Sequence, residues 1–378
     1  MSTGSGTNRL RLLSGEKSLL AVAAVAVAFA LVGSRWQAIL AYPAWAAVLF
    51  AFLFGMIVLG AVSVVRHADH LAVMLGEPYG TLILTLSIAS IEIMTIAVVM
   101  LTGEPNPTLA RDTMFSVVMI VCNGLIGVAL LLGGLRYHEQ EVNLQGVNAY
   151  LSVIVSLAVF GLIMPNYTLT TPGPTFSRGQ EGFLIAMCVG LYAVFLAIQT
   201  TRHRSFFLHP TQDGSGAGGE PLVHEADKRP VRYHVISLVG CLALVIYLTK
   251  QLAILLNHGL DVLGAPPALG ALLIAILVLA PEGLGGIKAA LANRLQRSIN
   301  IFLGSVLATL ALTIPSVVIL GLLQGKSVVL GLEGTEEIML ALTLLVSLIT
   351  FTSGRTNVLQ GAVHGMLFLG YLMLIIWR

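Results

Sequence analysis

Long apolar runs constrain this chain more than any other feature of its sequence. Eleven runs have about the length at which a helix crosses the hydrocarbon core of a bilayer, roughly 20 residues. They cover residues 18–33, 39–64, 80–102, 113–135, 147–165, 181–201, 234–256, 266–290, 298–324, 336–353 and 358–377. Because 57% of the 378 residues are hydrophobic and only 10% are charged, a soluble globular fold is excluded. The sequence predicts an all-α polytopic membrane protein with eleven transmembrane helices.

The basic residues favour one side of this predicted membrane. If the N-terminus is cytoplasmic, six of the twenty Lys and Arg residues fall on the far side, namely Arg35, Arg111, Arg178, Lys250, Lys326 and Arg378. The other fourteen are then cytoplasmic, as the positive-inside rule requires. An odd number of spans places the C-terminus on the far side. No clear cleavage site follows the first run, so we expect a retained helix rather than a removed signal peptide.

An internal repeat is visible in the spans. The segment GTLILTLSIASIE (Gly80 to Glu92) aligns with GALLIAILVLAPE (Gly270 to Glu282). A second echo joins VNLQG (142–146) to TNVLQG (356–361). The predicted parts are a tail and leading helix (1–38), a first five-helix repeat (39–201), a flexible cytoplasmic linker (202–233) and a second five-helix repeat (234–378). Because five is odd, the second repeat enters the membrane from the opposite side, an arrangement that many secondary transporters share.

The linker carries the one long polar segment of the chain, residues 209–232. It is rich in glycine and has charges of both signs. A regulatory or cation-sensing role is one interpretation. We prefer a solvated flexible loop, because mixed charges commonly do no more than keep a segment in water.

Two acidic residues lie deep in predicted spans, and they are the aligned pair Glu92 and Glu282. An acid at the centre of a membrane helix costs about 2.5 to 3.5 kcal/mol unless it is paired, protonated or in a polar cavity. A neutral glutamic acid that only packs is the alternative. The repetition of the placement in both halves favours a site, in which Glu92 and Glu282 bind a metal cation or protons in turn.

The second acid follows a proline. Pro281 lacks an N–H and crowds the preceding turn, and Gly283 lowers the cost of further distortion. We therefore expect a helix break at Pro281 and Gly283, where freed carbonyl oxygens line a cavity that suits a hard cation.

Other polar residues in the spans are candidates for completing the site. The predicted supporting oxygens are Thr85, Ser87, Ser90, Asn123, Ser305 and Thr309. For any hydroxyl, a bond to its own backbone is the competing interpretation. His364 is predicted to be a packed neutral imidazole, with a proton relay as the alternative. Arg111 and Arg297 are predicted to be interface anchors rather than gates.

Three segments carry a family resemblance. They are GEPYGTLILTLSIASIE, PEGLGGIKAALANRLQRSINIFLGSVLATLALTIP and SGRTNVLQGAVHGMLFLGYLML. They resemble the cation/proton exchanger family of the calcium/cation antiporter superfamily, and most of all its bacterial sodium, potassium and calcium:proton branch. The likeness extends through nearly all of residues 65–377 except the linker.

The resemblance implies a leading helix, two inverted five-helix repeats and a bacterial inner-membrane location. The cation-binding and proton-binding glutamates of the family fall on Glu92 and Glu282, and its second-half Gly-Ser falls on Gly304 and Ser305. The chain departs from the family pattern at Ile88-Ala89, Val278-Leu279, Ala308, Ser353 and Gln360. These departures leave fewer side-chain ligands, so Ca²⁺, which takes six to eight oxygens, is expected to be a weaker substrate than the family name implies, and a monovalent cation would need fewer ligands.

Several function classes are disfavoured. The net charge of +2 gives no reason to expect a nucleic-acid partner, and a nucleotide-binding GxxxxGK[ST] motif is absent. The three cysteines, Cys122, Cys188 and Cys241, fall in spans and predict neither disulfides nor a metal cluster. The partners expected are a metal cation, protons and the lipid bilayer, with no cofactor besides the transported ions and the oligomeric state left open. The sequence predicts a secondary active antiporter, and not an enzyme, that exchanges a metal cation (Ca²⁺ and/or Na⁺ or K⁺) for protons across the inner membrane by alternating access. A cation-selective channel is the alternative, and an intramembrane enzyme, for which HExxH is missing, is the least favoured.

Overall fold

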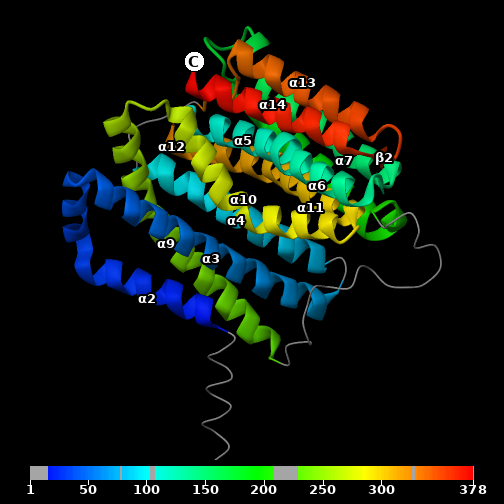
Figure 1. Cartoon of the computed structure of the whole chain (residues 1–378). Helices are drawn as coiled ribbons and strands as arrows, with labels where there is room; N and C mark the ends of the chain where they lie inside the picture. Colours follow the sequence, from blue (N-terminus) through cyan, green and yellow to red (C-terminus); the bar gives the residue numbers. More distant parts are fainter. Residues whose placement is uncertain (1–15, 77–78, 103–106, 208–228, 326–327, 378) are drawn as a thin grey trace, which may run out of the picture.

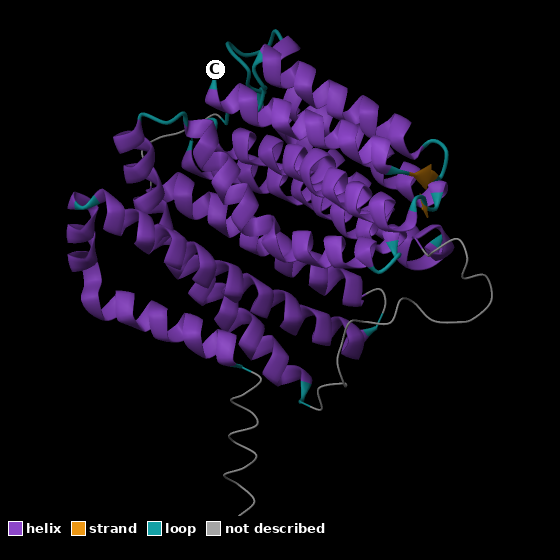
Figure 2. Ribbon diagram, viewed as in Figure 1, coloured by secondary structure: helices purple, strands orange, loops and turns teal. Residues whose placement is uncertain are grey.

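The fold is a bundle of membrane-length helices with one very small sheet at one end (Figures 1 and 2). The computed structural model describes residues 16–76, 79–102, 107–207, 229–325 and 328–377. Most of the linker and the N-terminal tail lie outside these residues. The helices and helical turns are α2 Lys17–Val32, η1 Gly33–Ala41, α3 Pro43–Leu75, α4 Tyr79–Thr102, α5 Leu109–Met119, η2 Ile120–Leu125, α6 Ile126–Tyr137, α7 Leu144–Ala158, η3 Val159–Ile163, η4 Met164–Tyr167, α8 Arg178–Ala197, η5 Ile198–Arg202, η6 Arg204–Phe207, α9 Val231–Leu263, α10 Pro267–Leu291, α11 Leu295–Ala308, η7 Thr309–Thr313, α12 Ile314–Gln324, α13 Gly334–Phe351 and α14 Val358–Ile376.

The number of spans agrees with the sequence. Within the described residues, ten helical segments are long and apolar enough to cross a membrane, and α4, with 24 residues, is the eleventh. Some spans combine several elements, such as α5, η2 and α6 in Leu109–Tyr137, and α11, η7 and α12 in Leu295–Gln324. The predicted all-α architecture with eleven transmembrane helices is confirmed.

Two helices are longer than their apolar runs. α3 continues through a polar stretch to Leu75, and α9 begins at Val231 and ends at Leu263. The sequence interpretation stopped these helices early because it followed hydropathy alone. The extra turns persist because their polar side chains have partners, such as the buried pair His67 and His234, whose Nδ1 atoms lie 3.1 Å apart.

The two predicted repeats share one interior. α3 of the first packs along α9 of the second, with α2 against both of them, and these three helices lie together on one side of the bundle (Figure 1). α5 packs on α10, α7 packs on α11, and α6 packs on α14. The largest apolar cluster draws buried side chains from both repeats. The carboxyl-bearing helices α4 and α10 therefore lie among helices of the opposite repeat.

Glycines allow the backbones of α6 and α14 to come into direct contact. A Cβ atom on Gly361 would lie 2.5 Å from the nitrogen of Leu131, and one on Gly127 would lie 2.9 Å from the nitrogen of Gly365. Such distances exclude any side chain at these positions. Small residues allow membrane helices to gain van der Waals contact where the hydrophobic effect gives no driving force.

The expected helix break at Pro281 and Gly283 is wrong. α10 continues without interruption from Pro267 to Leu291. The proline removes one helical hydrogen bond, to the carbonyl of Leu277, and the turns on either side keep theirs. The glycines serve packing instead, because a Cβ on Gly283 would lie 3.2 Å from Leu125, and one on Gly286 would lie 2.3 Å from Phe302.

The second sequence echo does not mark the repeat. The strands β1 (Gln140–Glu141) and β2 (Arg355–Thr356) pair antiparallel, so both echoes lie at the same end of the bundle (Figure 2). Equivalent positions of inverted repeats lie at opposite ends. The likeness instead reflects helix-start chemistry, because Asn143 and Asn357 each accept backbone hydrogen bonds as the N-caps of α7 and α14.

Candidate functional site

Glu92 is held by two threonines from the opposite repeat. Its side chain on α4 is 3% exposed. The hydroxyl of Thr309 donates to Oε2 at 2.7 Å, and the hydroxyl of Thr313 donates to Oε1 at 3.0 Å. Both threonines are fully buried. Each carboxyl oxygen thus accepts one hydrogen bond, an arrangement that suits the ionised form of the group.

The local sequence explains how both threonines reach one carboxyl group. Thr309 and Thr313 are the first and last residues of the π-helical turn η7, and residues four apart lie on the same face of a helix. Pro315 follows and has no N–H to offer the carbonyl of Ala311, which favours a local departure from α-helical bonding. π-turns inside helices are frequent at functional sites.

Glu282 has a different environment on α10. It is 7% exposed and both of its carboxyl oxygens are buried. Among the residues that the structure describes, no other residue donates a hydrogen bond to either oxygen. The carboxyl group lies close enough to Glu92 for the two to interact electrostatically. A buried acid beside a second acid and without donors requires a proton or a cation.

The chemistry of this donor set is that of hard oxygen ligands. Two carboxyl groups and two threonine hydroxyls come together, and within the described part of the chain no group of three or more His, Cys, Asp or Glu side chains is arranged to hold a metal. Oxygen ligands of this kind suit alkali and alkaline-earth cations rather than soft transition metals.

The other predicted oxygens meet different partners. Ser87 and Ser90 donate to the carbonyls of Ile83 and Leu86 one turn back, which is the competing interpretation stated for them. Thr85 lies in hydrogen-bonding contact with Tyr192 of α8. The structure does not bring these three to the carboxyl groups.

Ser305 lies on α11, one turn before Thr309, and is partly buried. No bond joins it to either acid among the described residues. Thr309 is therefore the one predicted supporting oxygen that contacts an acid. Thr313 escaped the sequence interpretation, although its spacing of four from Thr309 was a readable signal.

Asn123 contacts α13 and α14, and among the described residues no hydrogen bond joins it to either acid. It lies in the π-helical turn η2, where its Nδ2 donates to Thr343 at 2.8 Å and its Oδ1 lies 3.3 Å from Nδ1 of His364. Nε2 of His364 in turn lies 2.9 Å from the hydroxyl of Thr350. The predicted packed imidazole is thus part of a buried polar chain.

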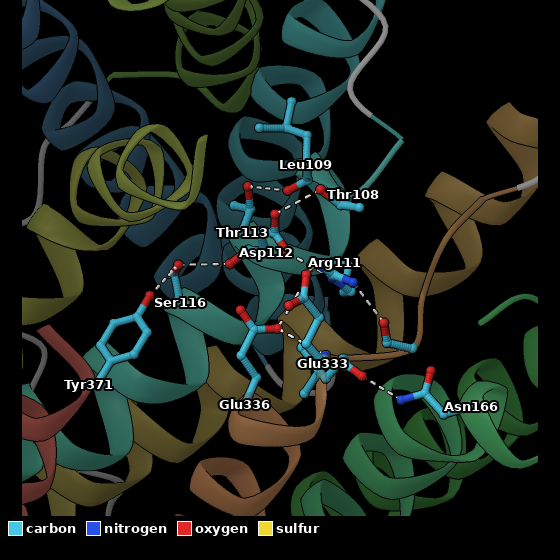
Figure 3. A network of polar contacts seen from close by, with 12 residues as sticks. Thr108, Leu109, Arg111, Asp112, Thr113, Ser116, Asn166, Glu333, Glu336 and Tyr371 are labelled. Carbon is cyan, nitrogen blue, oxygen red and sulfur yellow. Dashed lines mark hydrogen bonds and ion pairs between the residues drawn. The ribbon is translucent and has the colours of Figure 1, made fainter. Parts of the chain in front are cut away.

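Arg111 is not the interface anchor that its position suggested. The side chain is buried, and Figure 3 shows it among polar residues of both repeats. Its Nε donates to Asp112 at 2.7 Å, its Nη1 donates to the carbonyl of Gly331 at 2.8 Å, and Glu333 and Glu336 lie at 4.0 Å. The network ties α5 to the start of α13.

Comparisons with known proteins agree with the geometry. Residues 45–201 and 233–377 match the family of sodium/calcium exchanger proteins. The sodium-potassium/proton antiporter ChaA of Escherichia coli (strain K12) is 43% identical over 319 residues, which cover 83% of this chain and 85% of that protein. The putative ionic transporter y4hA of Sinorhizobium fredii (strain NBRC 101917 / NGR234) is 40% identical over 333 residues, covering 88% and 89%.

Solved structures show the same fold at low sequence identity. Native YfkE aligns with a TM-score of 0.72 at 17% identity, covering 95% of this chain and 99% of that one. The H⁺/Ca²⁺ exchanger CAX aligns with a TM-score of 0.65 at 13% identity, covering 95% and 88%. The resemblance drawn from the sequence is confirmed, and the protein is a transporter rather than an enzyme. This chain belongs to the sodium/calcium exchanger protein family.

Proposed function

We propose that this protein is a secondary active antiporter that exchanges a metal cation for protons by alternating access. The observation that carries the proposal is the unequal pair of buried carboxyl groups. Glu92 has two hydroxyl donors, and Glu282 has none from another described residue. A bare charge at this depth is costly, so each carboxyl group must be neutralised.

Exchange follows from competition for the same oxygens. Glu92, with a donor on each oxygen, is arranged as the carboxylate. Glu282, next to that negative charge, holds a proton or shares a cation with Glu92. A cation that binds expels the proton, and a proton that binds expels the cation. Net transport then requires only that the site open to each side in turn.

The cation we infer is Na⁺ or K⁺, with Ca²⁺ as a weaker substrate. The described site supplies two carboxyl groups and the hydroxyls of Thr309 and Thr313, six side-chain oxygens in all, which is only the lower end of the six to eight that Ca²⁺ takes. The E. coli relative is named a sodium-potassium/proton antiporter, whereas YfkE is named a Ca²⁺/H⁺ antiporter. The exchange needs no cofactor, because the proton gradient supplies the free energy.

We further propose that the protein resides in the bacterial inner membrane with its N-terminus cytoplasmic and its C-terminus periplasmic. The support is the excess of basic residues on one side and the odd number of spans. The start of α2 and the end of α14 lie at opposite ends of the bundle in Figure 1, as this arrangement requires.

Proton flux in proteoliposomes tests the exchange. The purified protein is reconstituted with a pH-sensitive dye in the lumen, and Na⁺, K⁺ or Ca²⁺ is added outside. Because cation entry expels protons, we expect the lumen to become alkaline in fixed proportion to cation uptake, and we expect this change to be lost in Glu92→Gln and in Glu282→Gln. The control is Glu181→Gln, which alters another buried acid, on α8, and leaves exchange intact. Wild-type flux in either site variant contradicts the proposal.

The same vesicles separate a carrier from the alternative, a cation channel. With the membrane potential clamped by a permeant ion, an antiporter still moves protons across the membrane in the direction opposite to the cation. A channel conducts the cation without an opposing proton movement. Cation current without any pH change in the lumen overturns the assignment as an antiporter.

A further inference from the structure

The buried polar chain at Asn123 has no role in the exchange described so far. Its members are the side chains of Asn123, Thr343, Thr350 and His364, and each is at most 4% exposed. They come from three different elements, η2, α13 and α14. Burying this many polar groups is costly unless all of them are hydrogen-bonded, and apolar side chains would fill the same space without that requirement. The presence of these four polar side chains therefore requires an explanation beyond packing.

The hydrogen bonds define the state of the histidine. Asn123 uses its Nδ2 to donate to Thr343, so its Oδ1 is the acceptor that faces His364. Nδ1 of His364 must then carry the hydrogen, and Nε2 accepts from the hydroxyl of Thr350. An imidazolium here would be a buried cation, and no carboxylate contacts it among the described residues. The arrangement therefore belongs to the neutral imidazole.

The element that carries Asn123 adjoins the turn of Glu282. η2 contacts α10, and Leu125 of η2 lies 3.2 Å from the position of a Cβ atom on Gly283, the neighbour of Glu282. The arrangement parallels the other half of the molecule, where the π-turn η7 supplies Thr309 and Thr313 to Glu92. Each acid thus has beside it a π-turn of the opposite repeat, and Asn123 is the polar side chain of η2.

We propose that His364 is a positioning residue for the exchange site. It fixes the carboxamide of Asn123, together with Thr343, so that η2 keeps one geometry against the turn of Glu282. It does not carry the transported proton. The proposal rests on the proposed antiport and adds to it a residue on α14 that touches neither acid.

A pair of substitutions isolates the contact that matters. In His364→Asn the side-chain nitrogen occupies the place of Nδ1 and still donates to Asn123. In His364→Gln the nitrogen occupies the place of Nε2 and reaches Thr350 instead. We expect His364→Asn to keep the KM for Na⁺ and K⁺ within about threefold of wild type, and His364→Gln to raise it roughly fivefold to tenfold, the effect of one neutral hydrogen bond. Because neither side chain titrates, both variants keep the wild-type pH profile.

A second variant on another helix guards against a folding defect. Thr343→Val removes the hydroxyl that accepts from Nδ2 of Asn123 and changes the side-chain volume little. We expect Thr343→Val to raise the KM as much as His364→Gln does, and Thr343→Ser, which keeps the hydroxyl, to have the wild-type KM. Folding is checked by size-exclusion chromatography in detergent. Equal KM values in His364→Gln and wild type overturn the proposal, as does an unchanged KM in Thr343→Val. A shifted pH profile or loss of proton flux in both His364 variants overturns it in favour of a proton relay.

The failure of the underlying antiport has a different signature. If Glu92→Gln and Glu282→Gln still exchange cations for protons, the proposed function fails whatever His364 does. If these two variants are inactive and His364→Gln matches wild type, the antiport stands and the positioning role alone is wrong.

Discussion

Removing the hydroxyls that hold Glu92 is the sharpest perturbation of the site. Thr309→Val and Thr313→Val keep the shape of the side chain and delete one donor each. Both hydroxyls bond a carboxyl group that is 3% exposed, so water cannot replace them readily. A hydrogen bond to a charged group contributes about 1.5 to 3 kcal/mol.

This free energy converts directly into a rate effect. At 1.36 kcal/mol per factor of ten, each substitution should lower kcat/KM for Na⁺ or K⁺ roughly 10-fold to 150-fold. Thr309 donates at 2.7 Å and Thr313 at 3.0 Å, so we expect the larger loss in Thr309→Val. The double variant should fall short of the product of the two, because both bonds end on one carboxyl group.

The assay is initial proton flux in proteoliposomes over a range of cation concentrations, with protein amount normalised. Thr313→Ser restores a hydroxyl and should recover most of the activity. Thr249→Val on α9 is the matched control, because that buried hydroxyl donates only to the carbonyl of Val245 in its own helix. Wild-type kcat/KM in both Thr309→Val and Thr313→Val refutes the reasoning, even if Glu92→Gln is inactive.

Three further predictions concern stability in detergent, measured as the midpoint of thermal unfolding by tryptophan fluorescence. Arg111→Met leaves the buried Asp112 without its charged partner and should destabilise the fold by about 3 kcal/mol, whereas Arg178→Met at the exposed start of α8 should change little. Gly361→Ala forces α14 away from Leu131 and should cost about 1 to 3 kcal/mol, while Gly370→Ala, where the nearest atom is a methionine methyl at 3.6 Å, should be tolerated. Glu16, just before α2, makes a pH-dependent contact. Burial raises the pKa of its carboxyl group. Hydrogen bonds from Tyr233 and Arg229 and the electrostatic effects of Arg66 and His67 outweigh burial, so the pKa lies below its usual value. A lowered pKa in the folded state stabilises the fold above the unfolded pKa and loses that effect as pH falls through the folded value. The gap between wild type and Glu16→Gln should therefore be largest above the unfolded pKa of about 4.3 and should close as the pH falls through the lower folded pKa.

The sequence alone determined the framework of this protein. Hydropathy is a property of each segment by itself, so eleven apolar runs were sufficient to predict eleven spans. The cost of a buried charge is equally local, which is why Glu92 and Glu282 could be singled out before any partner was known. Thr309 followed from the same scan for polar residues at membrane depth.

Only the tertiary structure decided how these residues are used. Thr309 and Thr313 reach Glu92 across 217 and 221 positions of chain, and Asn123 turns to His364 across 241. Pro281 remains inside a continuous helix because α10 is packed on several sides, and the echo at Asn143 and Asn357 proved to be two N-caps at one end of the bundle. Hydrogen-bond partners are chosen by which helix faces meet, and periodicity within one segment carries no information about the segment that packs against it.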